Sequence, residues 1–252
     1  MDLQLTGTRV LVTGGTRGIG RAVVEAFLDE GAVVGFCARG SDEVTATETA
    51  LRGRGTASGT ALDVGDADAL AAWVERSAET VGGLDVVVAN VTALAIPDTE
   101  ENWQASLNVD LMHTVRLVRA AMPHLERSDA ASIIAISSVS GRESDFASGP
   151  YGTAKTAIVG YLHGLAMQLA PQGIRANTVS PGNTYFEGGV WAGIETGDPD
   201  LFRTAVELNP TGHMGTPEEV AGPVVFLASR RSRRVSGTNL VVDGALTRGV
   251  QL

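Results

Sequence analysis

The sequence predicts an α/β fold in which residues 1–252 form a single doubly wound domain, with a parallel seven-stranded sheet and helices on both faces. Two observations predict it. Short apolar, β-branched runs recur along the chain, and they are continuously apolar rather than alternating with polar residues, which is typical of strands buried on both faces. Helical patterns lie between them, and strand alternating with helix implies a parallel sheet.

Each element follows from its own pattern. The helix predicted over 20–31 gathers Val23, Val24, Phe27 and Leu28 on one face, and Gly31 is its predicted C-cap. A second helix is predicted over 66–83 on the same logic. No Pro- or Ser-rich linker and no repeat interrupts the chain, so one domain is the economical interpretation. The predicted strands are 9–14, 32–38, 57–64, 84–90, 132–138, 174–181 and 239–244.

Composition excludes several function classes. The net charge of −10 argues against nucleic acid and against anionic membrane surfaces, since both need basic patches. The one basic run, 230–234, is interpreted as a solvated loop. Cys37 is the only cysteine, so no intrachain disulfide is possible, and it is predicted to be a buried thiol. The four histidines lack metal-ligand spacing, so no metal site is expected. No signal peptide or long apolar stretch is visible, which favours a cytoplasmic protein.

The stretch "TGGTRGIG" (13–20) lies where the first predicted strand turns into the first helix. One of Gly14, Gly18 and Gly20 allows the tight turn, one lets the backbone approach a pyrophosphate, and one lets the helix pack on the strand. N–H groups at the helix start then meet the phosphate. A triplet of glycines can be a mere turn, but this position, after a strand and before an amphipathic helix, predicts a nucleotide site.

The stretch "YGTAK" (151–155) places a phenol and an ammonium four residues apart, on one helix face. A nearby cation favours phenolate, so we expect Tyr151 to ionise more easily than a free tyrosine. Such a tyrosine could donate and accept a proton. The pair also occurs by chance on surface helices, so the rest of the chain decides its meaning.

Several motifs occur together in one order: "TGGTRGIG", "LDV" (62–64), Asn90, Asn108, Ser138, "YGTAK" and "SPG" (180–182). In this order they resemble the short-chain dehydrogenase/reductase family, whose fingerprint is T-G-x-x-x-G-x-G. The resemblance covers nearly the whole chain, including 215–229 and 236–244. It implies a Rossmann domain and a nicotinamide-dependent oxidoreductase.

The resemblance implies a catalytic tetrad. Tyr151 would donate the proton to a substrate carbonyl, and Lys155 would lower the pKa of Tyr151 and bind the nicotinamide ribose. Ser138 would polarise the carbonyl. Asn108 would hold a water that links Lys155 to solvent. Taken singly, each residue could be structural: a packing tyrosine, a strand-end serine, a buried helix amide. All four in family order favour catalysis.

The resemblance also implies the cofactor contacts. Asp63 and Val64 match an adenine pocket, although Asp63 could instead be a strand-end cap. Asn90 would contact the cofactor, and Pro181 and Gly182, at the end of the sixth predicted strand, would shape the loop beneath the nicotinamide. The residues expected at the cofactor are Gly14, Thr16, Arg17, Gly18, Ile19, Gly20, Arg39, Asp63, Val64, Asn90, Tyr151, Lys155, Pro181, Gly182 and Thr184.

The chain departs from the family at two places. "ANVT" (89–92) replaces N-N-A-G, so Ala89 and Thr92 stand where the family has Asn and Gly. Phe186 stands where the family often has a threonine that touches the cofactor. It belongs to a predicted substrate loop, about 184–212. The aromatic residues of that loop form either an apolar substrate wall or packing of the loop onto the body: Tyr185, Phe186, Trp191 and Phe202.

NADP(H) is the expected cofactor, with NAD(H) as the alternative. An acidic residue at the end of the second strand would accept from the ribose 2′-hydroxyl. Here the strand ends in "CARGS", so Arg39 stands there, and Arg17 lies in the glycine-rich turn. Guanidinium groups suit a 2′-phosphate. Asp42 and Glu43 follow closely and would reverse the expectation if the loop folded inward.

The expected function is interconversion of a ketone and a secondary alcohol by an NAD(P)(H)-dependent enzyme, with a small, apolar carbonyl or alcohol as substrate. The alternatives are a 3-oxoacyl-[acyl-carrier-protein] reductase and a non-catalytic dinucleotide sensor. Few cations flank the helices near 102–125 and 151–170, which argues against an acidic carrier protein. Both helices carry apolar residues on more than one face, and the family pairs them across a two-fold axis, so a homotetramer is expected.

Overall fold

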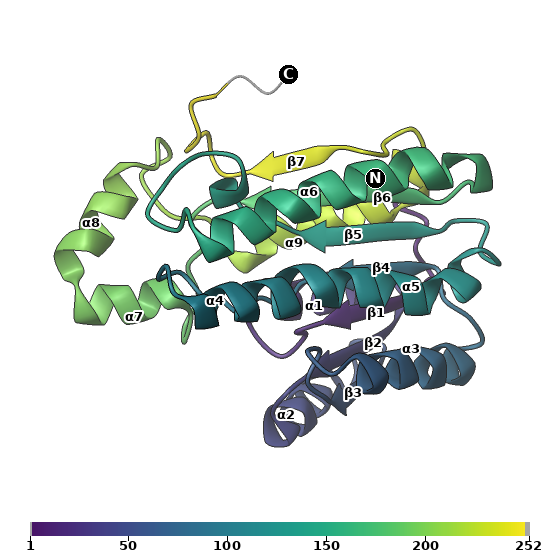
Figure 1. Ribbon diagram of the computed structural model, residues 1–252. Coiled ribbons are helices and arrows are strands. Elements are labelled where there is room, and N and C mark those ends of the chain that lie inside the picture. The colour runs from purple at the N-terminus through teal and green to yellow at the C-terminus, as the bar shows by residue number, and fades with distance from the viewer. Residues whose placement is uncertain (1, 250–252) are drawn as a thin grey trace.

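The structure is a computed structural model that describes residues 2–249. All seven strands join one parallel sheet, as predicted, and their order in it is β3-β2-β1-β4-β5-β6-β7 (Figure 1). Each predicted strand is present, with ends shifted by a few residues at most. The strands are β1 (Arg9–Thr13), β2 (Val33–Ala38), β3 (Thr56–Ala61), β4 (Val86–Ala89), β5 (Ser132–Ile136), β6 (Arg175–Pro181) and β7 (Asn239–Val242).

Helices cover both faces of the sheet. One face packs against α1, α2 and α9, and the other against α3, α5 and α6, so two apolar cores lie on either side of the strands. The α-helices are α1 (Gly18–Asp29), α2 (Ser41–Leu51), α3 (Ala67–Val81), α4 (Glu100–Ala105), α5 (His113–Leu125), α6 (Pro150–Leu169), α7 (Val190–Gly197), α8 (Pro199–Glu207) and α9 (Pro217–Ala228). A π-helical stretch, Ser106–Met112, joins α4 to α5.

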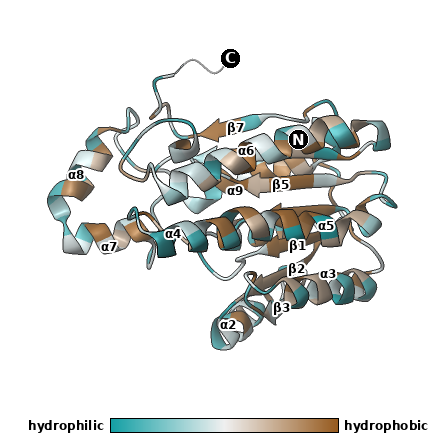
Figure 2. Ribbon diagram, viewed as in Figure 1, coloured by the Kyte–Doolittle hydropathy of each residue, from teal (hydrophilic) through white to brown (hydrophobic). Residues whose placement is uncertain are grey.

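Burial follows the position of each strand in the sheet. The central strands β4 and β5 are buried at every residue, and Figure 2 shows the sheet interior as mostly hydrophobic. The prediction of burial on both faces is wrong for β3, whose residues are exposed or half-exposed, and for β7, which is half-buried throughout. These two strands are the sheet edges, where each has a neighbour on one side only.

The order in which strands are added to the sheet reverses between β1 and β4, because β2 and β3 follow on one side of β1 while β4, β5, β6 and β7 follow on the other. In such sheets ligands bind outside the carboxyl ends of the strands at this switch point. The helices α7 and α8 project beyond that end of the sheet (Figure 1). They lie within the predicted substrate loop, 184–212.

Cys37 of β2 is fully buried, as predicted, and burial raises the pKa of its thiol to about 12. No helix among residues 2–249 combines the length and the apolar character that crossing a membrane requires.

Candidate active site

The glycine-rich turn fits a dinucleotide phosphate. A Cβ on Gly20 would collide with the carbonyl oxygen of Gly14, so glycine alone lets α1 start this close to β1. Arg17 is the N-cap of α1, and no side chain of residues 2–249 caps the first turn, which also lacks acidic residues. The backbone N–H groups of the first turn of α1 can therefore donate to an anion. Thr16 and Ile19 lie half-buried in the same turn.

Asn90 fastens this turn to the end of β4. Its backbone N–H donates to Thr13 Oγ1 at 3.0 Å, and its side-chain amide donates to the carbonyl oxygens of Thr13 and Gly14 at 3.1 and 3.3 Å. The Asn90 side chain is thus occupied in shaping the turn. Thr13 is a site residue that sequence reasoning missed, although it precedes the glycines directly.

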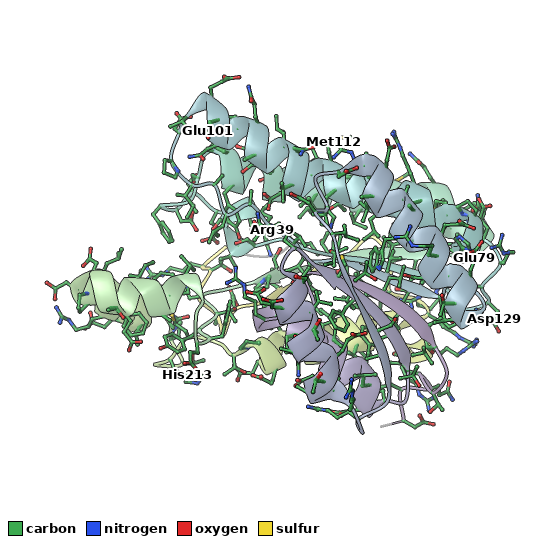
Figure 3. All side chains as sticks on the ribbon, turned by 90° about the horizontal axis from the view of Figure 1, so that it is seen from below. Arg39, Glu79, Glu101, Met112, Asp129 and His213 are labelled. Atoms are coloured by element: carbon green, nitrogen blue, oxygen red, sulfur yellow. The ribbon has the colours of Figure 1, made fainter. Side chains whose placement is uncertain are left out.

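The adenosine end of the predicted site lies at the carboxyl ends of β2 and β3. Arg39 follows β2 and is exposed, as is Arg17, and neither guanidinium has an ion-pair partner within residues 2–249. Asp63 follows β3 and its Oδ1 accepts from the Gly65 N–H at 2.8 Å, while Val64 is buried beside it. In Figure 3 Arg39 lies near the middle of the view, between His213 at the lower left and Glu79 and Asp129 at the right.

The segment that follows β6 forms the nicotinamide end of the predicted cofactor site. Pro181 is the last residue of β6. Thr184 Oγ1 donates to the Gly182 carbonyl at 3.1 Å, and Thr184 pairs with Gly215 in a short parallel bridge. This pairing fixes the backbone of the segment where it leaves the sheet.

Phe186 lies over the glycine-rich turn. Its ring packs on Gly18 so closely that a Cβ there would stand 2.6 Å from Phe186 Cζ. The first residue of α1 and the substrate loop therefore touch in this conformation. The residue that departs from the family pattern sits directly at the predicted phosphate site.

Gly141 brings the segment after β5 onto α6. A Cβ on Gly141 would stand 2.8 Å from the carbonyl carbon of Lys155, so the short 3₁₀ turn Val139–Gly141 lies directly on the helix. Two hydroxyls fasten the contact: Ser137 Oγ donates to the Lys155 carbonyl at 2.9 Å, and Thr156 Oγ1 donates to the Gly141 carbonyl at 2.8 Å.

Ser138 and Tyr151 are placed by this contact. Ser138 follows β5, is 8 % exposed, and its Oγ accepts from the Ser140 N–H at 3.1 Å, which leaves its own proton available to donate. Tyr151 is the second residue of α6 and is half-buried. Both belong to the carboxyl side of the sheet, close to the switch point.

Lys155 is buried beneath Tyr151. Its Nζ lies 5.5 Å from the centre of the Tyr151 ring and donates to the Ile136 carbonyl at 3.2 Å. Its ion-pair partner is Asp110 in the π-helical stretch, with Nζ 3.1 Å from Oδ1, and the two side chains are 3 % and 0 % exposed. Among the described residues Asp110 Oδ1 accepts no hydrogen bond, so its contact with Lys155 Nζ is an ion pair.

Asn108, predicted as the fourth member of the tetrad, lies apart from Lys155. Its side chain is exposed, and its Oδ1 accepts from Arg116 Nη1 at 2.7 Å. Its amide nitrogen faces Gly65, where a Cβ would stand 3.1 Å away. The structure therefore places Asn108 beside the Asp63 turn, and Asp110, two residues on, takes the position at Lys155.

His113 links the π-helical stretch to the glycine-rich turn. Its Nδ1 lies 2.8 Å from the Val109 carbonyl, so Nδ1 carries the proton, and Nε2 accepts from Thr13 Oγ1 at 3.0 Å. Burial lowers the pKa of His113 to about 4, which keeps the ring neutral near neutral pH. Sequence reasoning missed this histidine because it shows no metal-ligand spacing.

The aromatic residues of the substrate loop mostly pack the loop. Trp191 is buried with Ala205 and Met214, Phe202 packs against this cluster, and Tyr185 Oη donates to Glu195 at 2.6 Å. Phe146, from the segment before Tyr151, meets Trp191 edge to face at 6.0 Å and remains 61 % exposed. An exposed aromatic ring therefore borders the segment that is predicted to be catalytic.

Comparison with known proteins gives consistent matches. The family model described as enoyl-(acyl carrier protein) reductase matches residues 14–247. Isoepoxydon dehydrogenase of Penicillium expansum is 43 % identical over 98 % of this chain and 97 % of its own length. L-fucose dehydrogenase of Mus musculus is 34 % identical over 98 % of this chain and 90 % of its own.

Two solved structures of short-chain oxidoreductases are similar to the whole fold. A short-chain oxidoreductase of Pseudomonas aeruginosa, described as NADPH-bound and as having an atypical catalytic centre, superposes with a TM-score of 0.88 at 29 % identity and covers 96 % of this chain and 98 % of its own. A short-chain dehydrogenase/reductase variant of Serratia marcescens gives the same TM-score at 30 % identity, with the same coverage of both chains. The chain belongs to the short-chain dehydrogenase/reductase family of oxidoreductases.

Proposed function

We propose that the protein is an NADP(H)-dependent oxidoreductase that interconverts a ketone and a secondary alcohol, with Tyr151 as general acid and base. The observation that carries the proposal is the Lys155 ammonium, buried 5.5 Å from the centre of the Tyr151 ring. Ser138 on the same side of the sheet supports it. A lysine buried and paired in this way is not the solvated surface residue that chance spacing would leave.

In the reduction direction Tyr151 Oη gives its proton to the substrate carbonyl oxygen. The Ser138 hydroxyl donates a hydrogen bond to that oxygen and stabilises the negative charge that develops on it. Lys155 places a positive charge beneath the phenol, which favours loss of the proton at that step. The dinucleotide, when bound, supplies the hydride.

The residues around the predicted cofactor site favour NADP(H). Arg17 and Arg39 are exposed, with no ion-pair partner within residues 2–249. The Glu43 carboxylate, which would favour NAD(H) if it faced the ribose, lies over Gly40 at the start of α2. Guanidinium groups bind phosphate through forked hydrogen bonds. The Pseudomonas aeruginosa structure described as NADPH-bound supports the same cofactor.

We propose a free small molecule, rather than a carrier-bound thioester, as the substrate. The net charge of −10 would repel an acidic carrier protein at long range. The names of the two relatives refer to isoepoxydon and L-fucose, and neither refers to a carrier. The description of the matching family model does name acyl carrier protein, so the carrier-bound substrate belongs in the test.

The test is a substrate screen with the purified protein. Diketones, cyclic ketones, ketosteroids and 3-oxoacyl thioesters are each supplied with NADPH and, separately, with NADH, and loss of the reduced cofactor's absorbance is followed. We expect turnover of a free ketone with NADPH as the better cofactor. Preference for the carrier-bound thioester over its small analogue would overturn the substrate proposal, and NADPH binding without turnover of any substrate would favour the non-catalytic sensor.

A further inference from the structure

The ion pair of Asp110 and Lys155 is enclosed in the protein. The exposed fractions of the two side chains are 0 % and 3 %, and 3.1 Å separates Oδ1 from Nζ. Bringing two charges out of water is costly, and a lone buried charge is costlier still. A pair at this depth, next to the proposed acid, calls for a role in addition to packing.

Asp110 is itself held in place. Its Oδ2 accepts from the Ala93 N–H at 3.1 Å, and its backbone carbonyl accepts from Thr114 Oγ1 at 2.9 Å. Lys155 Nζ has two partners in the described chain, Asp110 and the Ile136 carbonyl at the end of β5. The carboxylate thus fixes the ammonium between the π-helical stretch and the sheet.

We propose that Asp110 is a positioning residue, whose carboxylate anchors the Lys155 ammonium and offsets part of its positive charge at Tyr151. This rests on the proposed function, because it assigns Asp110 a part in the proton transfer of Tyr151. An amide at the same place would hold the ammonium without offsetting its charge. The nature of residue 110 therefore sets the pH at which the phenol works.

The ionisable groups and polar atoms around Asp110 come from several elements. Lys155 contacts Asp110 from α6 and separates it from the Tyr151 ring, and His113, which feels the charges of both Asp110 and Arg116, lies near it at the start of α5. The segment after β4 contributes the Ala93 N–H, and the end of β5 contributes the Ile136 carbonyl. Because burial lowers the pKa of His113 to about 4, its ring stays neutral over the pH range of an assay.

The kinetic test compares wild type with Asp110→Asn and Asp110→Ala across pH in the alcohol-oxidation direction. We expect Asp110→Asn to keep most of kcat, because its amide oxygen still reaches Nζ, but to shift the midpoint of the pH profile to lower pH, since removing a negative charge favours phenolate. Asp110→Ala should lose about tenfold to a hundredfold in kcat with KM little changed, because catalytic groups displaced by about 1 Å lose about this much.

The control is Asp85→Asn, which breaks a partly buried pair with Arg9 at the amino end of β4, far from the site. It should lower stability and leave the pH midpoint unchanged. An Asp110→Asn profile that coincides with those of wild type and of Asp85→Asn would overturn the proposal.

A stability cycle separates this outcome from failure of the proposed function. The urea midpoints of wild type, Asp110→Asn, Lys155→Met and the double variant are measured without substrate. If the pair is ionic, the two substitutions are not additive, and the double variant unfolds at higher urea than the single variants predict. Additive effects would contradict the anchoring even in an active enzyme. Non-additivity in a protein that turns over no substrate would remove the proposed function alone.

Discussion

His113 shows how one buried side chain connects two parts of the site. Its Nε2 accepts a hydrogen bond from the Thr13 hydroxyl, and its Nδ1 donates one to the Val109 carbonyl. The ring therefore joins the glycine-rich turn to the π-helical stretch that carries Asp110. The bond at Nε2 needs the neutral ring, because a protonated Nε2 cannot accept the Thr13 hydroxyl proton. Protonation would place a hydrogen on Nε2 and a charge in a site with no exposed surface.

Stability should therefore depend on the titration of His113. Its pKa falls from 6.5 to about 4 on folding, so between these values the unfolded chain binds the proton first and stability is lost as pH falls. The full effect is on the order of 3 kcal/mol at 1.36 kcal/mol per unit. We expect the free energy of unfolding of His113→Gln, measured with urea, to fall less steeply from pH 7 to pH 4 than that of wild type. The exposed His163→Gln should keep the wild-type slope; a shared slope for all three proteins would refute this role of burial.

Arg39 should decide between the two dinucleotides. Its exposed guanidinium follows β2, where the 2′-substituent of the adenosine ribose is expected. Arg39→Asp should lower kcat/KM for NADPH by about tenfold to a hundredfold, the size of a lost charge-assisted hydrogen bond, and spare that for NADH. Arg52→Asp, the same charge change at the end of α2, should alter neither. Equal or better use of NADH by wild type would defeat the expectation.

At the scale of elements, the substrate loop should compete with the cofactor. The Phe186 ring lies on Gly18, in the turn that is expected to receive the pyrophosphate. Phe186→Thr should tighten NADPH binding by about threefold to tenfold, because a contact worth roughly 1 kcal/mol no longer has to be broken. Binding is measured by titration calorimetry, with Phe226→Thr on α9 as the control. Weaker binding by Phe186→Thr would mean that the ring packs on the bound cofactor instead.

The sheet could be predicted from the sequence because most of its inner strands contain a short apolar run, such as "VVVA" of β4, which is typical of a strand buried on both faces. The exposed faces of β3 and β7 could not, since the order of strands is a tertiary property. Nothing in the run "ASGTALDV" indicates that the strand β3 lies at the sheet edge, with β2 as its one neighbouring strand.

The placement of the candidate site residues could be predicted where one motif contained them. It could not be predicted where two residues were candidates for the same position. One motif contains both Tyr151 and Lys155, and Ser138 directly follows a predicted strand, so each has a single candidate. The position next to Lys155 has two candidates, Asn108 and Asp110, which lie two residues apart and point to different partners. A signal was present. Stepping back by threes and fours from Leu117 along the buried face leads through Thr114 to Asp110 and Ser106, all of them buried. The π-helical geometry of Ser106–Met112 is not visible in the residue types.

At the scale of the whole molecule, we propose a homotetramer. Of the apolar residues on the two helices that suggested it, Leu107 is 44 % exposed, whereas four face the core of their own chain: Val118, Ile158, Leu162 and Leu169. Met167, which the prediction did not include, is 73 % exposed on the second helix. Leu111, Val115 and Leu165 are half-buried. Exposed apolar groups of this kind indicate a partner surface.

Light scattering at micromolar concentration should give about four times the chain mass of 26.1 kDa. Leu165→Glu should reduce the mass, because a carboxylate would be buried at the interface without a partner. Glu79→Lys, an exposed charge change on α3, should not. A monomeric mass for wild type would remove the proposal.

The acid/base role of Tyr151 is tested most directly by Tyr151→Phe, which removes one hydroxyl and keeps the ring. Turnover and NADPH binding are measured on the same preparation, with Tyr161→Phe, a half-buried tyrosine of the same helix, as the control. Loss of the general acid should reduce kcat by ~10²–10⁴-fold while the Kd for NADPH stays nearly unchanged, and Tyr161→Phe should keep its turnover. A Tyr151→Phe enzyme that retains more than about a tenth of kcat, with chemistry rate-limiting, would contradict the mechanism.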